Sequence, residues 1–358
     1  MAQLLAPLWE GFRRRGVGLA APTDGTLVPR TFGDATAEHL ATRRGCGLFD
    51  FSFMGHFEIA GRNARRAVGH LQTRSVGSLA PGRLAYTLLL RHDGTVLVDA
   101  TAWCLAPDRW WLFTGCRADL AVIAETAGAG HVRDLSGAHA VLALQGPASA
   151  RVLDRHLDAS PRIGYFAFRE TTVAGTPVVI GRLGYSGELG YELVVPADAA
   201  PALWQRLAAD AEVRECGFEA ANSLRIESGF ILFTNELARP ADPFTLGLGR
   251  LVSFDHRPFV GADSLRALLR RGPERRLVGL APVVQERRPR SSTGSLPRGE
   301  ATSRARSPIF GCELALGFVP ADAAEPGALV GISETERARV CRLPFYDPGR
   351  VLPRTPRG

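Results

Sequence analysis

Short stretches of alternating apolar and polar residues recur along most of the chain, separated by amphipathic segments. The clearest lies between Arg83 and Asp99, where apolar side chains occupy every second position over residues 84–90 and His92-Asp93-Gly94 supplies a turn. Such alternation around a Gly-containing turn predicts a β-hairpin. The same criterion predicts strands at 47–59, 109–114, 140–144, 166–173, 178–180 and 193–195.

Helices are predicted where the apolar spacing changes to a period near 3.6. In residues 34–44, Asp34 can cap the first turn, and Ala35, His39 and Leu40 share a face. Further helices are predicted at 63–71, 118–127, 148–157, 199–210 and 217–227. From about residue 132 the order of elements starts again, which indicates an internal pseudo-repeat of two α+β halves.

The pattern changes near residues 255–275. Beyond it, short strands are expected at 277–280, 315–319, 328–332 and 338–341, a spacing typical of a small β-barrel. Residues 283–307 are rich in Arg, Ser, Pro and Gly and predict a long flexible loop. We therefore expect two domains, residues 1–260 with two α+β halves and residues 275–358 with the barrel.

Composition narrows the class of protein. With 358 residues the chain can form two or three domains. No apolar run has transmembrane length, and the first residues lack the pattern of a signal peptide, so a cytoplasmic location is expected. The six cysteines and eight histidines show no metal-ligand spacing. No metal site is predicted.

All 43 basic residues are arginine. The absence of lysine excludes a P-loop, a pyridoxal-phosphate Schiff base and a lysine nucleophile. The net charge of +7 favours an anionic partner. Nucleic acid would require a basic stripe with interleaved aromatic residues or a known module, and neither is present. An acidic small molecule fits the charge as well.

A glycine-rich stretch, Gly181–Glu192, is the strongest candidate for a binding site. Glycines recur at every third position and are interleaved with two tyrosines and two glutamates. Glycine permits close backbone approach, tyrosine offers a stacking face, and a carboxylate accepts two parallel hydrogen bonds. These residues predict a loop that binds a planar ring with adjacent N–H donors. The alternative is an exposed Gly-rich hairpin.

Six motifs, taken together and in order, resemble the aminomethyltransferase family, that is, the T-protein of the glycine cleavage system and its tetrahydrofolate-using relatives. The resemblance covers nearly the whole chain. The motifs are Leu48-Phe-Asp50-Phe-Ser-Phe-Met-Gly55, Tyr86 with Gly94-Thr-Val-Leu-Val-Asp99, Ala143-Leu-Gln-Gly-Pro147, Gly184-Tyr-Ser-Gly-Glu188 with Gly190-Tyr-Glu192, Ser223-Leu-Arg-Ile-Glu-Ser-Gly229, and Thr302-Ser303 with Ser307-Pro308 and Ala315-Leu-Gly-Phe-Val319.

The resemblance implies an α+β fold, a cloverleaf of pseudo-repeated folate-binding domains plus a small C-terminal β-barrel, with tetrahydrofolate as the cofactor. It implies that Glu192 binds the pterin, that Tyr86 and Tyr185 line the pocket, and that Arg225 supports it. Asp99 would be the catalytic aspartate. The alternatives are a strand-end turn residue for Asp99, a core aromatic for Tyr86 and a structural ion pair for Arg225.

The chain also departs from the family pattern. Val98 stands where the glycine-cleavage proteins have a first Asp, Phe53 replaces a histidine, and Ala221-Asn222 replaces Arg-Asp. The sequence around Asn222 is more similar to that of the folate domains of sarcosine and dimethylglycine dehydrogenases. The tail from Leu343 also differs.

Two functions are therefore expected from the resemblance. The first is an enzyme that moves a methyl, methylene or aminomethyl group from a small donor to tetrahydrofolate. The second is a non-catalytic folate-binding module that captures one-carbon units for a partner dehydrogenase or oxidase subunit. An iron–sulfur accessory role is disfavoured, because residues 226–233 lack the cysteine of that branch. No nucleic-acid or membrane partner is expected.

Overall fold

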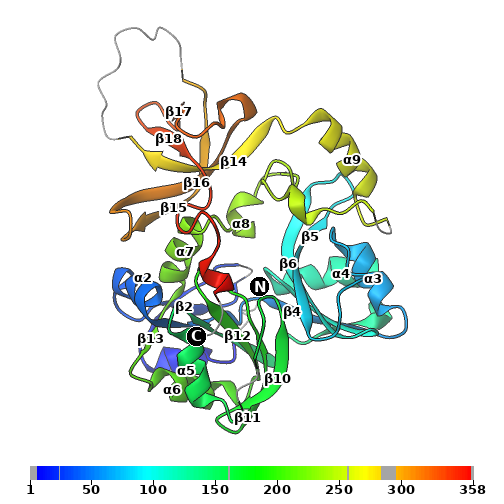
Figure 1. Ribbon diagram of the computed structural model, residues 1–358, viewed down its shortest axis with the longest axis vertical. Coiled ribbons are helices and arrows are strands. Elements are labelled where there is room, and N and C mark those ends of the chain that lie inside the picture. The colour runs from blue at the N-terminus through cyan, green and yellow to red at the C-terminus, as the bar shows by residue number, and fades with distance from the viewer. Residues whose placement is uncertain (1–5, 24, 160–161, 256–257, 284–295, 356–358) are drawn as a thin grey trace.

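Four β-sheets and the helices packed on them make up the described part of the protein, seen in a computed structural model that describes residues 6–23, 25–159, 162–255, 258–283 and 296–355 (Figure 1). A five-stranded and a six-stranded sheet form the α/β part, and a second five-stranded sheet belongs to the C-terminal part. A two-stranded sheet of β1 (Gly18–Ala20) and β2 (Val28–Thr31), preceded by α1 (Trp9–Arg14), completes the N-terminal region.

The first sheet contains the predicted hairpin. Its strand order is β5-β6-β7-β4-β8, and its helices α3 and α4 bury Val68 and Ile123 against Trp110 and Leu112 of β7. Apolar residues recur on one face of each helix, as burial against a sheet requires. The bounds are β4 (Gly55–Ala60), α3 (Ala64–Leu71), β5 (Arg83–Leu90), β6 (Val96–Ala106), β7 (Arg109–Thr114), α4 (Leu120–Ala127) and β8 (Val132–Asp134).

The second sheet has the order β10-β11-β12-β9-β3-β13. Its central strand β9 is buried along nearly its whole length, which explains its continuous apolar sequence. The bounds are α2 (Ala35–Arg44), β3 (Cys46–Asp50), β9 (His139–Gln145), α5 (Ser149–His156), β10 (Phe168–Val173), β11 (Thr176–Gly181), β12 (Gly190–Pro196), α6 (Ala200–Ala208), β13 (Val213–Glu215), α7 (Phe218–Glu227) and α8 (Phe233–Glu236).

The single strand predicted at 47–59 is wrong, because the chain breaks between β3 and β4. The Asp50 carboxylate accepts the backbone N–H of Ser52, which turns the chain out of the extended path. β3 then pairs with β9 of the second sheet, while β4 pairs with β7 of the first. The two sheets therefore do not follow the two predicted halves of the chain.

The C-terminal sheet, β15-β16-β14-β18-β17, is antiparallel throughout, and a bridge between Arg298 and Gly331 joins its two edges. The fold class is thus confirmed. The bounds are β14 (Arg275–Pro282), β15 (Glu300–Ser307), β16 (Cys312–Pro320), β17 (Leu329–Gly331) and β18 (Arg337–Cys341).

Two segments near this sheet differ from expectation. The predicted loop at 283–307 is wrong for residues 300–307, which form β15; residues 284–295 of that prediction lie outside the described part of the chain. In the predicted boundary, residues 262–271 form helix α9 (Ala262–Arg271). Within the described ranges no helix is long and apolar enough to cross a bilayer.

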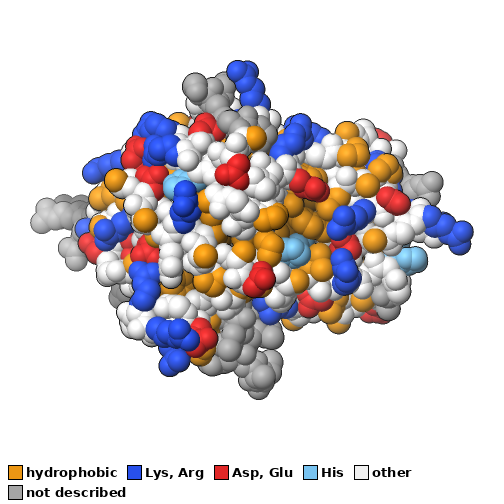
Figure 2. Space-filling view, turned by 90° about the horizontal axis from the view of Figure 1, so that it is seen from below, with side chains coloured by type: hydrophobic (Ala, Val, Ile, Leu, Met, Phe, Trp, Pro, Cys, Tyr) orange, Lys and Arg blue, Asp and Glu red, His pale blue; other side chains and the backbone are white. Residues whose placement is uncertain are grey.

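Charged side chains are mixed on the face seen in Figure 2. Arginines lie among acidic residues there, around apolar atoms that gather near the centre. That face has no basic stripe of the kind that a nucleic-acid backbone requires.

Candidate functional site

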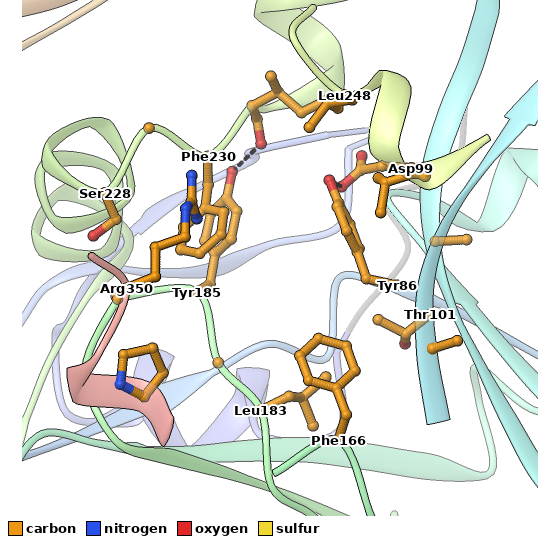
Figure 3. Close-up of a pocket in the computed structure, with 18 of the residues that line it drawn as sticks. Tyr86, Asp99, Thr101, Phe166, Leu183, Tyr185, Ser228, Phe230, Leu248 and Arg350 are labelled. Atoms are coloured by element: carbon orange, nitrogen blue, oxygen red, sulfur yellow. Dashed lines mark hydrogen bonds between the residues drawn. The ribbon is translucent and has the colours of Figure 1, made fainter. Parts of the chain in front are cut away.

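A cavity of about 890 Å³ lies where the two α/β sheets meet the C-terminal part of the chain. Its walls come from the β5–β6 hairpin, the loop between β11 and β12, the segments 228–233 and 246–251, and the tail 343–354 (Figure 3). The size is in the range of cofactor and substrate pockets. Four of the predicted site residues line it, namely Tyr86, Asp99, Tyr185 and Glu192.

Asp99 and Tyr86 form a pair on the hairpin. Leu88 lies opposite Asp99 in the register of β5 and β6, so Tyr86 is a diagonal neighbour on the same face. The Tyr86 hydroxyl donates to the Asp99 carboxylate over 3.0 Å. Burial raises the pKa of Asp99 to about 6, against the opposing effect of this hydrogen bond. Asp99 therefore provides the pocket with a carboxyl group that can gain or lose a proton near neutral pH.

Val98, next to Asp99, stands where the glycine-cleavage proteins have a first Asp. Val98 is fully buried in the core under α3 and α4, on the opposite face of β6 from Asp99. An acidic side chain at this position would point into that core. The pocket of this chain therefore has no second hairpin acid.

Glu192 is a buried carboxylate with no hydrogen-bond donor among the described residues. It lies within β12, opposite Ala143 of β9, and only 8% of its surface is exposed. Burial raises the pKa of Glu192 to about 7. Since buried polar groups are nearly always paired, an unpaired carboxylate in a pocket wall points to a ligand. Glu192 was predicted in a loop, and the structure places it in a strand.

Tyr185 forms part of an aromatic wall. Its hydroxyl donates to the Ile231 carbonyl, and its ring stacks on Phe230 with centroids 5.7 Å apart. The Arg350 guanidinium lies over the other ring of this pair, 5.3 Å from the Phe230 centroid (Figure 3). The wall thus offers flat apolar surface with one cation at its edge.

The recurring glycines of residues 181–190 were predicted to let the backbone approach a ligand, but the structure gives another reason for them. A Cβ on Gly184 or Gly190 would come within 2.0 or 2.4 Å of the Gln145 amide, and one on Gly181 within 2.2 Å of Trp103. Only Gly187, with φ at +81°, needs glycine for its backbone conformation as well. These glycines make room for the protein's own side chains rather than for a ligand.

Arg225 does not line the pocket. Its fully buried guanidinium pairs with Glu236 over 3.0 Å and donates to Ser303 of β15 and to the Phe230 carbonyl. This arrangement corresponds to the alternative given in the sequence analysis, a structural ion pair. The hydrogen bond from Arg225 to the Phe230 carbonyl joins Arg225 to a residue of the pocket lining.

Several pocket residues were missed from the sequence. Phe230, Leu248 and the tail residue Arg350 come from irregular segments with no periodic signal. Five arginines in the lining have no carboxylate within ion-pair distance among the described residues. They are Arg74, Arg83, Arg250, Arg350 and Arg354.

Fold and site together define a class of protein in which an α/β part and a small antiparallel barrel surround a pocket lined by acidic and aromatic side chains. Comparison with known families then identifies two matching profiles. Residues 18–256 match the GCVT N-terminal domain and residues 275–347 match the glycine cleavage T-protein C-terminal barrel domain.

Curated proteins and a solved structure agree with these profiles. The chain is 37% identical over 341 residues to an aminomethyltransferase of Streptomyces coelicolor, covering 89% of this chain and 91% of that protein. It is 38% identical over 342 residues to that of Streptomyces avermitilis, with the same coverage. The glycine cleavage system aminomethyltransferase T from Bartonella henselae matches with a TM-score of 0.83 at 28% identity, covering 97% of this chain and 99% of that one.

The chain therefore belongs to the aminomethyltransferase family, a family of transferases, and the resemblance predicted from its motifs is confirmed.

Proposed function

We propose that this protein binds tetrahydrofolate in the pocket and transfers a one-carbon unit to it from a small methylated or aminomethyl donor. The observation that carries the proposal is Glu192, whose buried carboxylate has no partner among the described residues and faces the pocket. A pterin edge presents a ring N–H and an amino group side by side, which matches two carboxylate oxygens.

The rest of the lining supports the same ligand. Tyr185 and Phe230 offer a stacked aromatic wall to a flat molecule. The unpaired arginines of the lining, Arg250 and Arg350 among them, suit the acidic glutamate tail of a folate. Bound tetrahydrofolate would supply the nitrogen that accepts the one-carbon unit.

Asp99 is proposed as the catalytic group. Transfer of a one-carbon unit from an amine passes through a centre that carries positive charge, and a buried carboxylate stabilises such charge strongly. Tyr86 holds this carboxylate in place by its hydrogen bond. With a pKa of about 6, Asp99 is mostly ionised at neutral pH and can also accept a proton from the donor amine.

The donor is proposed only as a class. Ala221 stands where the glycine-cleavage proteins have a substrate-binding arginine, and Asn222, at the position of the following aspartate, accepts a hydrogen bond from Arg225. This supports a donor other than a lipoyl-bound aminomethyl group, as the motif similarity to sarcosine and dimethylglycine dehydrogenases suggests. In the alternative function, a folate-binding module serving a partner oxidase, Asp99 would have no catalytic role.

Binding is tested with Glu192→Gln. We expect tetrahydrofolate to bind the wild type in calorimetry and the variant roughly 10- to 100-fold more weakly, because one carboxylate oxygen becomes an amide donor. Glu170→Gln, on the exposed face of β10, is the matched control and should bind normally. Absence of binding to the wild type would overturn the proposal, and unchanged affinity in Glu192→Gln would overturn the pterin contact.

Catalysis is tested with Asp99→Asn. The variant keeps the shape and an acceptor for Tyr86 but loses the charge, so we expect turnover of a confirmed donor to fall by about 100-fold or more. Folate affinity, measured by calorimetry, should change much less. Equal turnover in wild type and variant would favour the non-catalytic module instead.

A further inference from the structure

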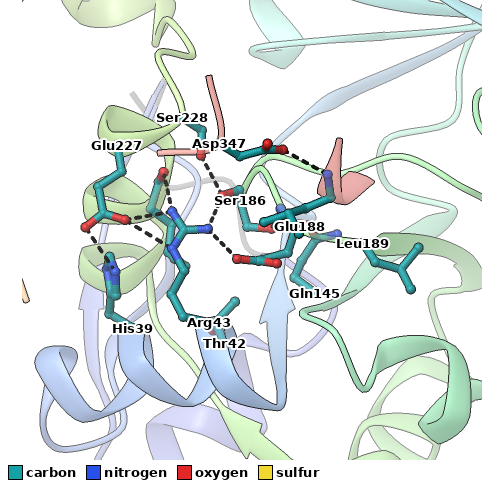
Figure 4. A network of polar contacts seen from close by, with 12 residues as sticks. His39, Thr42, Arg43, Gln145, Ser186, Glu188, Leu189, Glu227, Ser228 and Asp347 are labelled. Atoms are coloured by element: carbon teal, nitrogen blue, oxygen red, sulfur yellow. Dashed lines mark hydrogen bonds and ion pairs between the residues drawn. The ribbon is translucent and has the colours of Figure 1, made fainter. Parts of the chain in front are cut away.

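A buried ionic cluster lies behind the pocket wall, outside the lining itself (Figure 4). Arg43, in the last turn of α2, is at its centre, with 1% of its side chain exposed. It pairs with Glu188 over 2.9 Å and with Glu227 over 2.8 Å. Both carboxylates are also buried. Nothing in the proposed chemistry uses this cluster, so its position calls for another explanation.

The cluster holds the backbone of the loop between β11 and β12. The Arg43 Nη1 donates to the Ser186 carbonyl over 2.8 Å, and the Ser228 hydroxyl donates to the same oxygen over 2.6 Å. Ser186 lies between Tyr185 and Gly187, which both line the pocket. Arg43 therefore fixes the loop that carries one wall.

The same guanidinium also holds the C-terminal tail. The ring of Tyr346 lies over its face, with 3.8 Å between the guanidinium carbon and the ring centroid. The Tyr346 backbone N–H donates to the Glu227 carbonyl over 2.9 Å. Tyr346 and Asp347 also line the pocket. One buried side chain thus contacts two pocket segments that are about 160 residues apart in sequence.

We propose that Arg43 is a positioning residue that couples the loop 184–188 to the tail 343–348, so that both segments are ordered together before ligand binds. The inference rests on the proposed function for the identity of that ligand. A guanidinium suits the task because its planar fork reaches carboxylates and a carbonyl while its face stacks on an aromatic ring. An ammonium group cannot make all these contacts at once. Since the chain contains no lysine, arginine at this position was uninformative in the sequence alone.

The first test follows backbone order by hydrogen exchange in the ligand-free protein. In Arg43→Met we expect amides of residues 184–188 and of residues 345–347 to exchange roughly tenfold faster together. Residues 83–86 of β5, which line the pocket without contacting Arg43, should be unaffected. Arg44→Met, one position along on the exposed side of α2, is the matched control and should match the wild type.

A second variant keeps the test valid if Arg43→Met does not fold, since that change leaves two buried carboxylates without their cation. Arg43→Lys retains the charge but loses the planar face. We expect it to fold and still to show faster exchange of the tail, with a smaller effect on the loop. Faster exchange of the loop alone in both variants, or of every segment equally, would overturn the coupling.

The second test measures ligand affinity and turnover. For Arg43→Lys we expect the dissociation constant of tetrahydrofolate to rise roughly ten- to hundredfold, while turnover at saturating folate falls much less, because the reacting groups are not altered. Unchanged affinity, with both segments exchanging faster, would show that their order does not serve this ligand and would overturn the positioning role. If the wild type bound no folate, the proposed function would fail, but the exchange experiment would still decide the coupling.

Discussion

Among single residues, Glu192 has the largest consequence for pH dependence. Its pKa is raised to about 7 in the folded protein from an ordinary value of 4.5. The folded state therefore binds more protons than the unfolded state between these values, and stability contributed by this group falls as pH rises through that window. Glu192→Gln removes this loss.

We thus predict that ligand-free Glu192→Gln melts at a higher temperature than the wild type at pH 8, by roughly 1–2 °C for each kcal/mol recovered. At pH 5 the two proteins should melt at nearly the same temperature. Thermal unfolding monitored by circular dichroism across this range is the measurement, with Glu170→Gln as control. A difference that did not depend on pH would show that the burial of charge at residue 192 is not its cause.

Some pocket residues lie in recognisable sequence motifs, and others lie in segments without any motif. Tyr86, Asp99, Tyr185 and Glu192 stand in motifs that carry the family resemblance, and the resemblance implied that they share one pocket. Phe230 lies in the irregular turn after α7, and Arg350 reaches the pocket because the chain returns to it after the barrel; no local pattern encodes either position.

At the scale of elements, the loop between β11 and β12 and the turn after β9 fit one another. The Gln145 amide fills the space left by Gly184 and Gly190, and the Ser186 hydroxyl donates to Gln145 over 2.7 Å. Two motifs that were separate in the sequence are therefore one packed unit, and the glycines cannot be exchanged independently of Gln145.

We predict that Gly184→Ala lowers the melting temperature and weakens folate binding, because its methyl group would overlap Gln145. Combining it with Gln145→Ser should restore part of the melting temperature by making room. Gly137→Ala, where a Cβ meets nothing within 4 Å, is the control. Thermal melts and calorimetry of the four variants are the measurements. Strictly additive losses in the double variant would contradict this packing explanation.

The missed strand β15 shows why element prediction failed where it did. Its inward side chains include Ser303 and Ser307, which bond to Glu236 and Glu227 of the α/β part. Buried polar partners replace the apolar residues that normally mark a strand, so the segment resembled a loop. Only the tertiary partners, more than sixty residues away, distinguish the two.

At the scale of the whole molecule, a shared apolar core joins the β5–β6 hairpin to the C-terminal barrel. One cluster of buried residues includes Leu88 and Leu90 of β5, Ile226 of α7, and Leu316 and Phe318 of β16. We expect shared burial of this kind to make the two parts unfold together rather than as independent domains. We propose that the predicted boundary between residues 260 and 275 does not separate two units of stability.

Leu316→Ala tests this cooperativity. Leu316 is fully buried, so its truncation should cost about 2–5 kcal/mol. All five tryptophans lie in residues 1–204, far from the barrel in sequence, and so report unfolding of the α/β part. We predict that the variant lowers the midpoint of tryptophan fluorescence by several degrees and keeps a single calorimetric transition. Ile309→Ala, at a partly exposed turn of the same barrel, should change neither. If Leu316→Ala instead produced a separate low-temperature transition with the fluorescence midpoint unmoved, the barrel would be an independent unit, and the pocket wall formed by the tail could open while the α/β part stayed folded.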